Sequence, residues 1–231
     1  LVMYVLFALV AITQFNLEIH AKVKHQDAVD LKSKENRKRF TAMMLVCTMF
    51  AICWIAYIQW ETTIASFTQS INISMSQYSV LWTINGIMIL VAQPLIRPII
   101  VILRGNLKHQ MFVGILIFMS SFLVTSFAHH FAIFVVGMVI LTFGEMFVWP
   151  AVPTIANKLA PEGKQGQYQG FVNSASTVGK AFGPFIGGIL VDAMNMSLMF
   201  VGMIVLLCFG LIFLSIFDRG LPKDKNETPI P

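Results

Sequence analysis

The chain has 231 residues, of which 57% are hydrophobic and only 12% charged, and its formal net charge is +5. Soluble globular domains carry roughly 25% charged residues, so this composition, with a mean hydropathy of +0.76, favours a membrane protein over a soluble domain. The sequence contains no glycine-rich phosphate loop, nucleophile elbow or zinc-protease motif, which argues against the common soluble enzyme classes.

Six apolar stretches are long enough to cross a bilayer as helices, which takes about 20 residues each. We expect these spans at 40–60, 79–103, 110–128, 131–157, 168–191 and 197–217. An earlier apolar run, Leu1–Ile12, lacks the basic start and small-residue cleavage site of a signal peptide. We interpret 1–17 as the end of a preceding helix, followed by a basic loop at 18–39, a six-helix bundle at 40–217 and a tail at 218–231.

Lysine and arginine occupy every second connection between these spans. The basic connections hold Lys22, Lys24, Lys32, Lys34, Arg37, Lys38 and Arg39, then Arg104 and Lys108, then Lys158 and Lys164, and finally Arg219, Lys223 and Lys225. Because basic loops stay in the cytoplasm, we expect a multi-pass protein whose C-terminus is cytoplasmic. The 18–39 loop is either a solvated connection or, in addition, a site for anionic lipid headgroups.

Two charged residues, Glu145 and Lys180, lie near the centres of consecutive spans. At about 1.5 Å per residue, both charges reach the same depth in the bilayer. An unpaired charge there costs about 2.5–3.5 kcal/mol, so we expect Glu145 and Lys180 to form an ion pair or to be bridged by one polar group. Such a pair either takes part in transport or proton movement, or is a fixed contact that sets helix register.

Other polar and aromatic residues form stripes along the predicted helices. The further candidates for a substrate or proton pathway are Thr142, Trp149, Asn173, Thr177, Asn85, Gln93, Tyr57 and Glu61. Asn85 and Gln93 have an alternative role as hydrogen-bonding groups between helices, and Glu61 an alternative role at the membrane interface.

Small residues recur along the 168–191 span. Gly179, Gly183 and Gly187 are spaced four residues apart, Gly188 follows, and Pro184 lies between them. This spacing lets a neighbouring helix approach closely, and proline with glycine also allows a bend. We therefore expect these residues to serve packing or conformational change.

The three cysteines, Cys47, Cys53 and Cys208, lie in apolar runs without CxxC spacing. We expect them to be packing residues rather than metal ligands or disulfide partners. His129 and His130 are adjacent in a predicted outer loop, and we interpret them as interface residues. No metal or other cofactor is expected.

Three segments carry a family resemblance: NGIMILVAQPL at 85–95, FGEMFVWPAVPTIANKLAP at 143–161, and GQYQGFVNSASTVGKAFGPFIGGIL at 166–190. In this order they resemble the C-terminal half of a major facilitator superfamily transporter, closest to the drug:proton antiporter branch, and the resemblance covers Leu1 to Phe217. It implies an all-α integral membrane fold in which 1–17 ends helix 6 of twelve and the six full spans are helices 7 to 12. It also implies a partner, the missing N-terminal half.

The resemblance implies a secondary transporter of small organic molecules, with proton-coupled efflux by alternating access between two halves. We expect it in the plasma membrane, with a small-molecule substrate, protons and the lipid bilayer as partners, and with no nucleic acid and no enzymatic activity. The alternative is a non-transporting membrane receptor or assembly protein on the same helices.

Overall fold

The computed structural model describes residues 34–102, 106–193 and 195–221. Within these ranges every regular element is a helix. The elements in chain order are α2 (Lys34–Tyr57), η1 (Ile58–Trp60), α3 (Thr63–Ser70), α4 (Met75–Ile102), α5 (Leu107–Thr125), α6 (Phe131–Leu159), α7 (Gln165–Ala193) and α8 (Met196–Ile216). The predicted helix end at 1–17, most of the basic loop and most of the tail lie outside the described residues.

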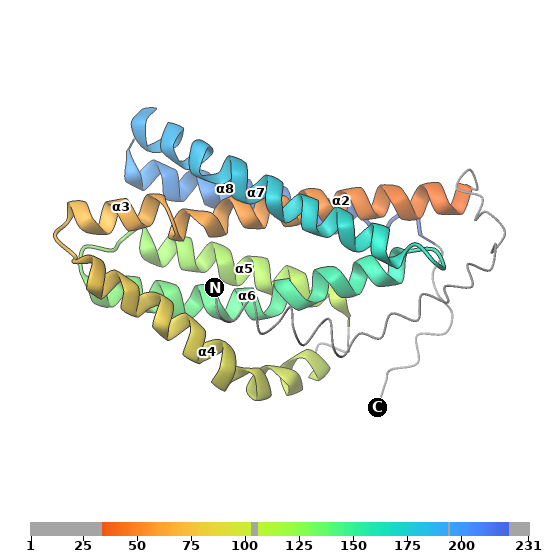
Figure 1. Ribbon diagram of the computed structural model, residues 1–231, viewed down its shortest axis with the longest axis horizontal. Coiled ribbons are helices and arrows are strands. Elements are labelled where there is room, and N and C mark those ends of the chain that lie inside the picture. The colour runs from red at the N-terminus through yellow and green to blue at the C-terminus, as the bar shows by residue number, and fades with distance from the viewer. Residues whose placement is uncertain (1–33, 103–105, 194, 222–231) are drawn as a thin grey trace, which may run out of the picture. The chain divides into compact units, whose positions relative to one another are not determined.

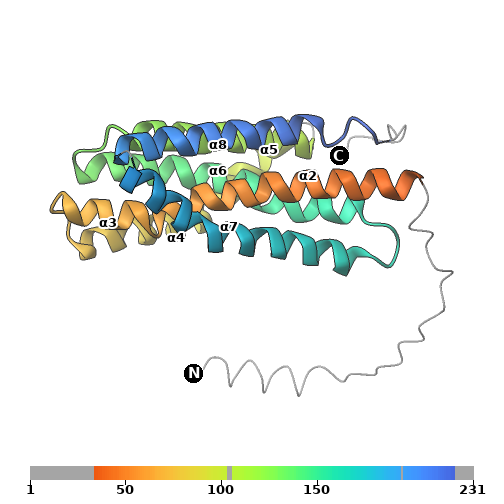
Figure 2. The same cartoon turned by 90° about the horizontal axis from the view of Figure 1, so that it is seen from above.

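The long helices alternate in direction along the chain, so their connections gather at two ends of the described bundle (Figure 1; Figure 2). α5 packs along α6, α2 packs against both α7 and α8, and α4 packs on α6. A buried apolar cluster runs through these contacts and includes Trp60, Phe118 and Phe134. The predicted all-α membrane fold is confirmed.

Five described helical segments are long and apolar enough to cross a membrane. They are Glu35–Ser70, Met75–Ala92, Leu107–Thr125, Phe131–Leu159 and Met196–Ile216. The sixth predicted span corresponds to α7, which is 29 residues long but is not among them. Its first half contains Gln167, Gln169 and Asn173, so α7 has the length of a span without the uniformly apolar surface of a lipid-facing one.

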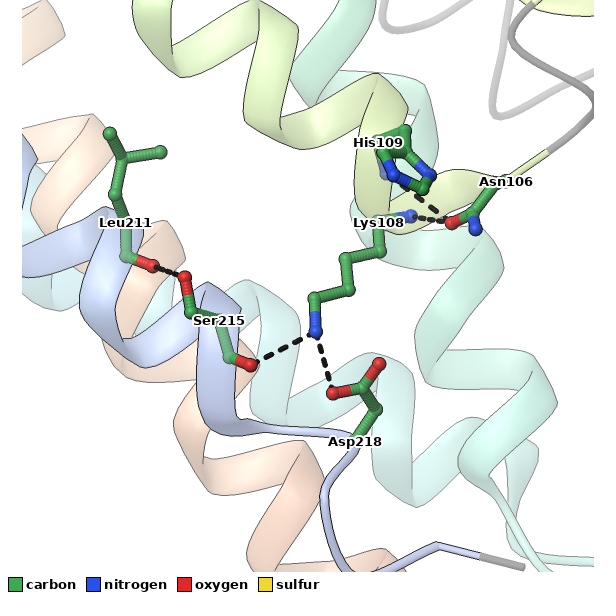
Figure 3. A network of polar contacts seen from close by, with 6 residues as sticks. All are labelled: Asn106, Lys108, His109, Leu211, Ser215 and Asp218. Atoms are coloured by element: carbon green, nitrogen blue, oxygen red, sulfur yellow. Dashed lines mark hydrogen bonds and ion pairs between the residues drawn. The ribbon is translucent and has the colours of Figure 1, made fainter. Parts of the chain in front are cut away.

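Helix α2 begins at Lys34, inside the predicted 18–39 loop. Arg39 and Glu35 form an ion pair at 2.8 Å one turn apart, which supports helix formation in this charged segment. Asparagine caps fix two other helix starts. Asn106 accepts hydrogen bonds from the backbone N–H groups of Lys108 and His109 at the start of α5, as Figure 3 shows, and Asn195 accepts one from Leu198 at the start of α8.

The segment after α2 continues through η1 into α3, and one fully buried amide supports this change of helix geometry. Gln59 donates from Nε2 to the carbonyl oxygens of Ile55 and Gly183, each at 2.8 Å. Its Oε1 accepts a hydrogen bond from Thr63 at 2.7 Å. Gln59 therefore joins the end of α2 to the start of α3 and to the middle of α7.

Glycines bring α7 and α2 into close contact. A β-carbon at Gly179 would lie 2.5 Å from Trp54 Cβ and 2.6 Å from the Ala51 carbonyl oxygen. β-Carbons at Gly183 and Gly187 would overlap side chains of the α2–η1 segment, whereas one at Gly188 would meet no atom within 4 Å. The glycine spacing thus corresponds to a packed face of α7 that includes Gly179, Gly183 and Gly187 and leaves out Gly188.

A second close approach joins α5 to α6. A β-carbon at Gly144 would lie 2.9 Å from the Gly114 carbonyl oxygen and 3.2 Å from the Phe118 backbone nitrogen. These atoms are backbone, so neither can move without shifting a helix. Both glycines are buried.

We predict that Gly144→Ala lowers the free energy of unfolding by about 1–3 kcal/mol, because the added methyl group overpacks the α5–α6 contact. Thermal unfolding of the purified protein in detergent measures this change. Gly86→Ala is the matched control, since a β-carbon at Gly86 in α4 would have no neighbour within 4 Å and alanine favours helix. Equal unfolding temperatures for Gly144→Ala and the unchanged protein would contradict a close backbone contact between α5 and α6 at Gly144.

Candidate functional site

A buried carboxyl group lies where α2, α4 and α6 meet. Glu145 in α6 is 8% exposed. Asn85 in α4 donates from Nδ2 to Glu145 Oε2 at 2.9 Å and to Thr142 Oγ1 at 3.0 Å. The Tyr57 hydroxyl in α2 donates to Glu145 Oε1 at 3.5 Å, a distance that makes this bond weaker than the one from Asn85. Three helices therefore contribute to one polar cluster.

The geometry of this cluster follows from the helical repeat. Thr142 and Glu145 lie three residues apart on one face of α6, so one amide can reach both. The Thr142 hydroxyl donates a hydrogen bond to the carbonyl oxygen of Met138 at 2.8 Å, which leaves a lone pair on Thr142 Oγ1 to accept from Asn85. Thr142 is fully buried and Asn85 is 7% exposed, so the hydrogen bonds satisfy polar groups that water does not reach.

Aromatic side chains cluster around Tyr57, whose hydroxyl contacts the carboxyl group. Trp54 stacks on Trp149 with ring centroids 4.8 Å apart, and Tyr57 meets both indoles edge-on at 5.3 and 5.4 Å. Phe118 lies 5.5 Å from Trp149, and Trp82 lies 6.2 Å from Tyr57. We call Trp54, Tyr57, Trp82, Phe118 and Trp149 the aromatic cluster. It combines residues of α2, α4, α5 and α6.

Lys180 does not form the contact with Glu145 that the sequence predicted, but lies against the ring of Trp54. Its Nζ is 4.0 Å from the centroid of the Trp54 ring, a cation–π contact. Among the described residues the ion pairs are Arg39–Glu35 and Lys108–Asp218, so the predicted Glu145–Lys180 ion pair does not form. Nor does one polar group bridge the two charges, since the contacts lead from Lys180 to Trp54, then to Tyr57 and then to Glu145.

The position of Gly179 explains this difference. Gly179 packs against Trp54 and Ala51, which fixes the rotation of α7 about its own axis. The next residue projects about 100° further round the helix, so Lys180 is directed past the α2 surface, where it is exposed. Residue counting predicted the same depth for Glu145 and Lys180, but equal depth does not mean that the two side chains point toward each other.

The remaining predicted residues are spread over several surfaces. Asn173 and Thr177 are exposed on α7, where Thr177 bonds to the carbonyl oxygen of Asn173. Glu61 is exposed after η1, and Pro184 is half-buried in α7. The side chain of Gln93 lies outside the described residues. The structure thus brings Tyr57, Asn85, Thr142, Glu145 and Trp149 together.

Two buried amides were missed by the sequence analysis. Gln59 is fully buried, and Gln110 in α5 is 3% exposed and donates to the carbonyl oxygen of Phe147 at 2.9 Å. Both are single amides at or within a predicted apolar span, the same signal that identified Asn85. Among the described residues, no group of three or more metal-ligating side chains occurs.

One donor in the aromatic cluster is unsatisfied. The indole Nε1 of Trp54 is buried and has no hydrogen-bond partner among the described residues. The cluster therefore combines ring faces, an acid held by two donors and an open N–H group. Binding sites for small organic molecules also combine apolar walls with a few polar groups.

Comparisons with known proteins give one consistent family. The family model for the Major Facilitator Superfamily matches residues 40–231. The uncharacterized MFS-type transporter YttB of Bacillus subtilis (strain 168) is 43% identical over 227 residues, which make up 98% of this chain and 57% of that protein. An uncharacterized MFS-type transporter of Methanocaldococcus jannaschii is 34% identical over 86 residues, or 36% of this chain and 22% of that protein. The chain therefore spans less than two thirds of each relative's length.

We predict that Asn85→Leu lowers the free energy of unfolding by about 1–3 kcal/mol, because Glu145 and Thr142 both lose a buried donor. Asn173→Leu is the matched control, since Asn173 is exposed on α7. Chemical unfolding of both variants in the same detergent compares them. If the two substitutions change the free energy of unfolding by the same amount, the hydrogen bonds that Asn85 donates to Glu145 and Thr142 do not stabilise the fold.

Proposed function

Because the chain belongs to the Major Facilitator Superfamily, we propose that it forms part of a secondary transporter that exports small organic molecules in exchange for protons. Members of this family are membrane transporters, and five described helical segments are long and apolar enough to cross a membrane. The single observation that carries the proton-coupled version is Glu145, a buried acid in α6 held by Asn85 and Tyr57 and paired with no described cation.

A carboxyl group in this setting is suited to carry a proton. Ionisable groups inside membrane proteins face a bundle interior or cavity and serve ion and proton pathways. Since Lys180 contacts Trp54 instead of Glu145, the charge of Glu145 is open to neutralisation by a proton or by a cationic ligand. Binding of one would displace the other, which is the exchange that proton antiport requires.

The aromatic cluster supports an organic substrate. Stacked and edge-on indole and phenol rings offer flat apolar faces and attract cations, and the buried Trp54 Nε1–H group has no acceptor among the described residues. Trp54 also contacts Lys180, and Tyr57 also contacts Glu145. A substrate that rearranged these rings would therefore act on both charged side chains.

We further propose that the complete transporter contains a second, N-terminal half and lies in the plasma membrane with the basic ends of its helices in the cytoplasm. The relative YttB extends well beyond the aligned region, and alternating access requires two halves around a central site. The described helix ends that carry Arg37, Lys108, Lys158 and Arg219 share one end of the bundle (Figure 1), which supports this orientation.

We predict that Glu145→Gln reduces transport driven by an imposed pH gradient at least tenfold, because the amide keeps the size of the side chain but cannot exchange a proton. The assay follows efflux of ethidium, an aromatic cation, and of a neutral aromatic dye from proteoliposomes that hold the complete transporter. Residual transport should no longer depend on the gradient.

Glu162→Gln provides the control, since Glu162 is an exposed acid in the turn between α6 and α7. Unchanged, pH-dependent efflux in Glu145→Gln would exclude Glu145 as the proton carrier. Absence of any flux with the unchanged protein across a broad panel of organic compounds would favour a non-transporting receptor or assembly protein.

A further inference from the structure

A groove opens at the basic end of the bundle, between the first turns of α2 and the end of α8. Its volume is about 340 Å³. It is lined by Arg37, Lys38, Thr41, Ala42, Leu45, Ile216, Phe217 and Gly220. The groove lies at the opposite end of α2 from η1 and α3, so it is separate from the aromatic cluster and from Glu145.

The rim of the groove carries two cations that pair with none of the described acids. Arg37 and Lys38 are exposed, and neither forms an ion pair with any described residue. The described acids nearest the groove in sequence are already engaged, because Glu35 is bound by Arg39 at 2.8 Å and Asp218 by Lys108 at 2.7 Å. Figure 3 shows the second pair, in which Lys108 also donates to the Ser215 carbonyl oxygen at 2.9 Å. The rim is therefore positively charged.

The wall of the groove is apolar. Ala42 and Phe217 are buried, and Leu45 and Ile216 are half-buried, so aliphatic and aromatic surface lies directly below the two cations. Gly220 has no side chain, and a β-carbon there would lie 4.0 Å from the Lys38 stem. A free phosphate ion would use only the rim, whereas a molecule that joins an anionic phosphate to a hydrocarbon chain would use both surfaces.

We propose that this groove binds the headgroup of an anionic phospholipid, with Arg37 and Lys38 on the phosphate and the apolar wall on the glycerol and the first acyl carbons. Arginine matches phosphate with two parallel hydrogen bonds, and lysine adds a point charge. Basic pockets between membrane helices on the cytoplasmic side suit such lipids. The bound lipid would contact both α2 and α8, which already pack against each other, and would stabilise the bundle by mass action.

The test is native mass spectrometry of the complete purified protein with equal amounts of phosphatidylglycerol and phosphatidylcholine. We expect preferential retention of phosphatidylglycerol, and we expect Arg37→Ala with Lys38→Ala to weaken that retention at least about tenfold, or about 1.4 kcal/mol. Gly220→Phe keeps both charges but fills the groove, and it should also reduce retention. Thermal unfolding without lipid confirms that each variant is folded.

Lys158→Ala with Lys164→Ala is the matched control, since it removes two positive charges from the same end of the bundle outside the groove. Equal losses in the two double variants would overturn the proposal in favour of diffuse surface attraction. No preference for phosphatidylglycerol in the unchanged protein would also overturn it. If glycerol phosphate displaces the lipid at equal concentration, the groove is a site for soluble phosphate and the lipid assignment is wrong.

Discussion

The need to satisfy a buried carboxyl group from within the protein organises the centre of this bundle. Hydrocarbon offers no hydrogen bonds, so a carboxyl group at that depth is stabilised by donors within the protein. Glu145 finds Asn85 on α4 and Tyr57 on α2. One acid on α6 therefore fixes the relative positions of three helices, and Thr142 completes the arrangement by sharing the Asn85 amide.

Glycine contacts make this arrangement sterically feasible. Gly114 and Gly144 bring α5 and α6 together, and Gly179 brings α7 onto α2 beside Trp54. The large rings of Trp54, Tyr57 and Trp149 then fill the space near Glu145. The glycines and the aromatic residues thus pack the same bundle together. Glycines let the helix backbones approach closely at some contacts, and large rings fill the wider spaces between the helices elsewhere.

In the proposed transport cycle, the same few side chains would respond to both proton and substrate. Tyr57 contacts the acid, and Trp54 contacts the cation Lys180 and has an open N–H group. A change at Glu145 would therefore reach α2 and α4 directly. Gln59, in η1 directly after α2, forms a second buried group of polar contacts through its hydrogen bonds with Gly183 in α7 and Thr63 in α3.

The sequence alone determined the class of fold, because apolar length and the placement of Lys and Arg depend only on local composition. It also identified Glu145, Asn85, Thr142 and Tyr57 as polar or aromatic residues worth attention, since each interrupts an apolar span. It could not assign their partners. The depth of a residue along a helix follows from residue counting, but the direction in which its side chain points depends on how neighbouring helices fix the rotation of that helix about its axis. Gly179 packing on α2 turned Lys180 toward Trp54, and only the tertiary structure decided that Asn85, not Lys180, holds the acid.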